Sequence, residues 1–104
     1  MTKRVLVIGL DGATWRVLTP LLRNGKLPFL KSLIDKSAYG TLKSVYPPIT
    51  IPAWVSFQTG VNPGRHGIFG FLNYRENPLA PPLYSSRSIK SQRIWDYLSY
   101  YDIK

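Results

Sequence analysis

The sequence predicts an α/β fold in which a mostly parallel central sheet is flanked by helices. The apolar, β-branched run of residues 5–10 is typical of a strand buried on both faces. Residues with helical spacing follow it, and residues 38–46 are again rich in β-branched and aromatic side chains. A strand, a helical segment and a second strand form a crossover unit, whose two strands are parallel in most proteins.

Two helices are predicted between these strands. Apolar side chains recur at helical spacing within residues 14–24, with Pro20 among them. Because proline fits the first turn of a helix, we expect one short turn before Pro20 and a helix after it that stops at Gly25. A second helix is predicted from Pro28 to about Lys36.

The second strand leads into a further helix. Thr50 is a suitable N-cap, Pro52 fits the first turn, and Gly60 is a usual stop signal, so a helix is predicted over residues 51–59. Pro, Gly, Asn and Ser are frequent in residues 61–90, which indicates surface loops.

A last helix is predicted from about Ser91 to Tyr101, with Ile94, Trp95 and Leu98 facing inward. Such a sheet would leave an edge strand without a partner. We therefore expect residues 1–104 to be the N-terminal segment of a larger catalytic domain, truncated here, with an exposed sheet edge that invites homo-oligomers.

Composition limits the classes of function. The 104 residues include 14 Lys and Arg against 5 Asp and Glu, a net charge of +9 that suits an anionic partner. The basic residues are scattered, and Arg87, Lys90 and Arg93 are the nearest approach to a cluster. Cysteine is absent, which is compatible with a cytoplasmic protein. Residues 5–10 are far fewer than the roughly 20 that a membrane span needs, so we expect no membrane association.

Two side chains are candidates for chemistry at one edge of the predicted sheet. Asp11 follows the first strand and Thr50 follows the second, and the carboxyl ends of parallel strands are where open α/β sheets bind ligands. A threonine hydroxyl needs a base or a metal to act as a nucleophile. From the pattern alone, Thr50 is more often only a helix cap and Asp11 more often a turn residue. His66, the single histidine, fits a structural role better than that of a ligand or base.

Three segments together resemble one known family. They are VLVIGLDG at residues 5–12, YPPITIP at residues 46–52 and TGVNPGRHGI at residues 59–68. In this order and spacing they are similar to the N-terminal part of the alkaline phosphatase superfamily, in particular its type I phosphodiesterase/nucleotide pyrophosphatase branch. The resemblance implies an alkaline-phosphatase-like sandwich with a mostly parallel sheet.

The resemblance also implies roles for individual residues. Asp11 would be a metal ligand, and Thr50 would be both the nucleophile and a ligand. The family uses two divalent metal ions, usually zinc, with manganese or magnesium as alternatives. The implied activity is hydrolysis of small phosphate esters through a phospho-threonine intermediate, as in phosphodiesterases and nucleotide pyrophosphatases. His66 is not among the implied ligands.

One position departs from the nucleotide pyrophosphatases, which carry an asparagine that binds a phosphoryl oxygen. Phe71 stands at that position, and Asn73 is the substitute we expect to bind substrate. After Thr50 the chain offers only His66, Glu76, Asp96 and Asp102 as further metal-ligand types. The remaining metal ligands are therefore expected to be missing, and the isolated 104-residue chain is expected to be inactive.

A different class of function competes with hydrolysis. A small basic α/β module could bind nucleic acid or form oligomers, and Tyr97, Tyr100 and Tyr101 near basic side chains could stack on bases. Tyr97 and Tyr101 are four residues apart and can also simply pack on one helix face. We consider nucleic acid the weaker alternative. Salt-dependent binding of single-stranded DNA would distinguish it from the phosphohydrolase.

Overall fold

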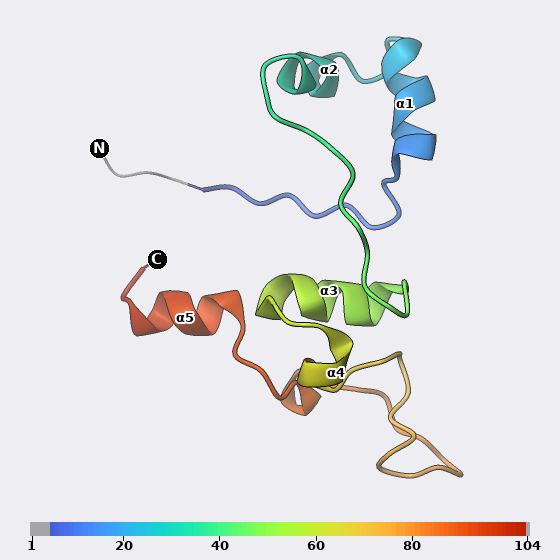
Figure 1. The fold of residues 1–104 in the computed structure, drawn as a ribbon, viewed down its shortest axis with the longest axis vertical. Coiled ribbons are helices and arrows are strands. Elements are labelled where there is room, and N and C mark those ends of the chain that lie inside the picture. The colour runs from blue at the N-terminus through green and yellow to red at the C-terminus, as the bar shows by residue number, and fades with distance from the viewer. Residues whose placement is uncertain (1–4, 104) are drawn as a thin grey trace. The chain divides into compact units, whose positions relative to one another are not determined.

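The computed structural model describes residues 5–103, and the chain divides into two units, one ending at Leu42 and one beginning at Lys43. Each unit is considered by itself below. The described elements are helical, and Figure 1 labels the α-helices along the chain. Their bounds are α1 Trp15–Arg23, α2 Pro28–Ile34, α3 Thr50–Thr59, α4 Pro63–His66, the 3₁₀ turn η1 Ser86–Ser88 and α5 Ile94–Tyr100.

The predicted central sheet is wrong for the described part of the chain. Residues 5–10 and 38–46 are extended or irregular but form no ladder, and the β-pairing within residues 5–103 is an isolated antiparallel bridge between Leu72 and Leu83. A strand exists only where a neighbouring strand completes its hydrogen bonds. The run expected to be buried on both faces is accordingly exposed, with Val5 at 87% and Ile8 at 73% of full accessibility.

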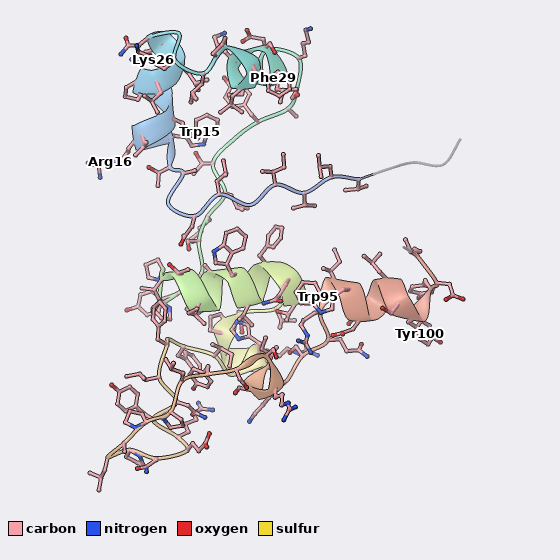
Figure 2. The ribbon with its side chains drawn as sticks, turned by 180° about the vertical axis from the view of Figure 1, so that it is seen from behind. Trp15, Arg16, Lys26, Phe29, Trp95 and Tyr100 are labelled. Carbon is pink, nitrogen blue, oxygen red and sulfur yellow. The ribbon has the colours of Figure 1, made fainter. Side chains whose placement is uncertain are left out.

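The N-terminal unit, residues 5–42, contains α1 and α2. Trp15 at the start of α1 contacts the segment after α2. Its Nε1 donates a hydrogen bond to the carbonyl of Gly40 at 3.1 Å, and the centre of its ring lies 5.5 Å from that of Tyr39. Figure 2 shows Trp15 and Phe29 in this unit; Phe29 of α2 is 74% exposed. None of the described residues in this unit is fully buried.

The two predicted helices of this unit are present with one difference. α1 is continuous from Trp15 to Arg23 and contains Pro20 in its interior, so the expected break before Pro20 is wrong. Pro20 is exposed, and water can therefore compensate the helical hydrogen bond that proline cannot make. α2 begins at Pro28 as predicted and ends at Ile34, two residues before the predicted Lys36.

The C-terminal unit, residues 43–103, holds the buried residues of the described chain. They come from α3, from α4 and from the second residue after α4, and they are Pro52, Val55, Pro63, His66 and Ile68. α3 and α4 contact each other across the short turn at Gly60, which has the left-handed conformation expected of a helix stop. The buried side chains of the described chain therefore gather around the α3–α4 contact.

The predicted last helix is present as α5, but it is not buried as predicted. It begins at Ile94 rather than near Ser91, and the expectation that its apolar face points inward is wrong. Ile94 is 52% exposed and Trp95 47%, and Leu98 is exposed as well. Figure 2 labels Trp95 and Tyr100 on this helix. No helix within residues 5–103 has both the length and the apolar character that crossing a membrane would require.

Candidate functional site

Thr50, the predicted nucleophile, is the first residue of α3. Thr50 was predicted to be the N-cap, but the helix begins one residue earlier than predicted, so Ile49 is the N-cap. Ile49 makes no side-chain capping bond. Thr50 is partly buried, and Pro52, two residues on, is fully buried. The first turn of a helix presents N–H groups that are not used within the helix, together with the positive end of the dipole. Negative charge on a group bound to Thr50 would therefore be stabilised at this place.

Asp11, the predicted metal ligand, lies in a turn after the extended residues 5–10. It is exposed, and the following residue, Gly12, adopts φ +69°. The amide of Thr14 donates to the carbonyl of Gly12 at 2.9 Å, which closes the turn just before α1. Asp11 and Thr50 belong to different units, so their sharing of one metal site stays a prediction.

Asn73, the predicted substrate-binding residue, is held in a turn of the C-terminal unit. Its backbone N–H donates to the carbonyl of Pro82 at 2.7 Å, and its side-chain Nδ2 donates to Oε2 of Glu76 at 3.0 Å. The side chain is partly buried. Asn73 therefore has a fixed orientation with one amide hydrogen engaged, and its contact with substrate stays a prediction.

The segment after α3 is built around His66. Asn62 caps α4 by accepting the N–H of Arg65 on its side chain, Pro63 occupies the first turn, and Gly67 ends the helix with φ +84°. This turn brings His66 back against α3, where its Nε2 lies 2.9 Å from Oγ of Ser56. The His66 side chain is completely buried.

The hydrogen bonds of His66 assign its tautomer and its charge. Nδ1 accepts the backbone N–H of Ile68 at 3.1 Å, so the ring proton lies on Nε2, which donates to Ser56. Burial lowers the pKa of His66 below its ordinary value of 6.5, while a hydrogen bond with the backbone of Pro52 opposes that shift. His66 is therefore neutral near pH 7 and uses both ring nitrogens internally.

This arrangement confirms the structural role that the sequence favoured for His66. A general base for Ser56 would need an unprotonated nitrogen facing the hydroxyl, and the nitrogen that faces it carries the proton. The sequence analysis missed Ser56 as the partner. The two residues are ten positions apart, and only the turn made by Gly60, Asn62 and Pro63 brings them together.

The residues described here do not by themselves form a complete metal centre. Within residues 5–103, no three His, Asp or Glu side chains are grouped so that they could hold a metal ion. His66 is already committed to Ser56 and Ile68. A metal site that includes Asp11 and Thr50 stays a prediction.

No curated protein and no solved structure matches the chain. The family described as type I phosphodiesterase / nucleotide pyrophosphatase matches residues 5–101, nearly the whole of the 104-residue sequence. The matched range includes Asp11, Thr50, His66 and Asn73. The chain belongs to the type I phosphodiesterase / nucleotide pyrophosphatase family.

Proposed function

We propose that this chain carries the nucleophile of an enzyme that hydrolyses small phosphate esters, and that the nucleophile is Thr50. Membership of the family indicates activity of the phosphodiesterase or nucleotide pyrophosphatase type. The observation that carries the assignment is the position of Thr50 within the matched range, at the first residue of the ten-residue helix α3. Phosphate groups bind readily at helix N-termini.

The proposed reaction proceeds in two displacements. In the first, Oγ of Thr50 forms a bond to phosphorus while the bond from phosphorus to the ester oxygen breaks, and the alcohol leaves with a proton. In the second, the oxygen of water forms a bond to phosphorus while the bond from phosphorus to Oγ of Thr50 breaks; Oγ takes up a proton of that water, and phosphate, or a monoester when the substrate is a diester, is released. The N-terminal end of α3 favours the negative charge on the phosphoryl oxygens in both steps.

We further propose that Asp11 and Thr50 are ligands for a pair of divalent cations, zinc first, with manganese or magnesium as alternatives. Such cations, when bound, lower the pKa of a hydroxyl and neutralise phosphoryl charge. The other ligands would come from residues that the described chain does not include.

The experiment uses bis(4-nitrophenyl) phosphate and compares Thr50→Ala with Thr50→Ser at added zinc. In a longer form of the protein that contains the remaining ligands, Thr50→Ala should abolish release of nitrophenol, whereas Thr50→Ser should retain part of the rate because a hydroxyl remains. Acid-quenched wild type should yield a phosphorylated peptide that contains Thr50. If Thr50→Ala kept most of the rate, Thr50 would not be the nucleophile.

Two further measurements test the cation and the isolated chain. Asp11→Asn should lower the zinc content of the longer protein, as measured by metal analysis, because an amide is a weaker ligand than a carboxylate. The 104-residue chain alone should release no nitrophenol above background. Cytoplasmic location, association of identical chains and the weaker nucleic-acid alternative stay predictions, and association can no longer be argued from a sheet edge within residues 5–103.

A further inference from the structure

A polar hollow in the C-terminal unit gathers three cationic side chains. Arg75, Arg87 and Lys90 line it, and Glu76 is the acidic residue in its wall. Gly67, Asn73, Tyr84 and Ser88 complete the lining. Its volume is about 310 Å³, which lies at the lower end of the ~300–1,000 Å³ typical of small-molecule sites. The hollow therefore has room for a small ligand and an excess of positive charge.

The walls of the hollow are fixed by backbone hydrogen bonds between distant segments. The amide of Lys90 donates to the carbonyl of His66 at 3.3 Å, and the amide of Tyr84 donates to the carbonyl of Phe71 at 3.0 Å. Asn73 is tied to Pro82 in the same way. These bonds hold the turn that carries Arg75 and the segment that carries Arg87 against the end of α4.

Two of the three cations are themselves positioned by their neighbours. The guanidinium carbon of Arg75 lies 5.5 Å from the centre of the Phe69 ring, a cation–π contact. The stem of Lys90 runs along Gly67, so that a β-carbon added there would lie 3.6 Å from Cδ of Lys90. Ordering these long side chains in advance reduces the entropy that a ligand must overcome on binding.

The positive charge of the hollow is not neutralised from within. Lys31 pairs with Asp35 and Arg93 pairs with Asp96, and neither pair involves a cation of the hollow. Glu76 accepts a hydrogen bond from Asn73 instead. Three cations beside one carboxylate leave a net positive charge, which suits a ligand with more than one negative charge.

We propose that this hollow binds the phosphate group of a small anionic ligand, with Arg87 and Lys90 as the principal contacts and Arg75 beside them. A guanidinium group can donate two parallel hydrogen bonds to two oxygens of one phosphate, and a lysine ammonium adds a compact positive charge. The proposal does not depend on the role of Thr50, because it concerns equilibrium binding rather than turnover. Failure of either proposal leaves the other standing.

The test measures binding of inorganic phosphate and pyrophosphate to the metal-free full chain by calorimetry at low salt. Pyrophosphate should bind more tightly than phosphate, because it carries more charge. The double variant Arg87→Gln/Lys90→Gln should weaken pyrophosphate binding at least about tenfold, since two charge-assisted contacts are lost. The matched control Arg16→Gln/Arg23→Gln removes the same charge from α1 and should change the affinity less than about twofold.

Further arms protect the result against misfolding and non-specific attraction. Arg87→Lys keeps the charge but loses the paired geometry, so it should bind with intermediate affinity even if the double variant folds poorly. Absence of pyrophosphate binding, unchanged affinity in Arg87→Lys, or equal weakening of pyrophosphate binding by both double variants would overturn the proposal in favour of a generally basic surface.

Discussion

Loss of the His66 side chain should strongly destabilise the α3–α4 core. The ring is completely buried and accepts the N–H of Ile68, whose side chain is 1% exposed. His66→Ala would leave that amide without a partner and open a cavity, at a combined cost of about 2–4 kcal/mol. Ser56→Ala removes one neutral hydrogen bond and should cost about 0.5–1.5 kcal/mol.

The assay is urea unfolding followed by circular dichroism, with amide hydrogen exchange at Ile68 as the local probe. Because both truncations delete the same Ser56–His66 bond, the double variant should cost less than the sum of the single variants. Ser32→Ala is the matched control: its hydroxyl also makes a hydrogen bond, to the carbonyl of Phe29, but on the exposed surface of α2. Its cost should stay within about 0.5 kcal/mol.

Two outcomes would refute this reasoning. His66→Ala that was no more harmful than Ser32→Ala would show that the buried ring does not hold α3 and α4 together. Strictly additive single variants would show that Ser56 and His66 do not interact in solution. The tautomer gives an independent check, since ¹⁵N chemical shifts of the ring should identify Nε2 as the protonated nitrogen near pH 7.

Three further predictions concern pH and helix ends. The pKa of His66 in the folded protein is lowered below 6.5, so the neutral ring contributes its full stabilisation of the fold above pH 6.5. That contribution to the free energy of unfolding should be lost as the pH falls from 6.5 through the folded pKa. The unfolding curves of His66→Gln should lack this pH dependence. Gly60→Ala places a β-carbon on a residue with φ +70° and should lower the free energy of unfolding by about 1–2 kcal/mol, as measured by urea unfolding. Gly70→Ala is the control and should be nearly neutral, because Gly70 does not have a positive φ. Equal costs for the two variants would show that the backbone conformation of Gly60 is not the cause. The amide of Arg93 donates to Oδ2 of Asp96 at 2.7 Å and lowers the pKa of that carboxyl, so Asp96→Ala should fray the first turn of α5 in NMR secondary shifts; unchanged shifts would contradict the cap.

Helix ends could be predicted from the sequence because their signals are local. Proline at the start of α2, proline within the first turn of α3 and glycine after α3 act through the conformation of their own backbone, and these elements lie within two residues of their predicted bounds. The break expected in α1 was wrong, since the helix runs through Pro20, which is exposed. The inward face predicted for α5 was wrong because burial requires a partner surface, which a pattern within one helix cannot supply.

The family and the residue types of the candidate site followed from the sequence, since both depend on the order of Asp11, Thr50 and the residues around them. The partnership of Ser56 with the buried His66, and the meeting of Arg75, Arg87 and Lys90 in one hollow, were decided by the tertiary structure alone. The absence of a sheet within residues 5–103 was decided there too. Hydrogen bonds between distant segments, and the ladders that make a strand, depend on which parts of the chain meet in space, and side-chain periodicity carries no information about that meeting.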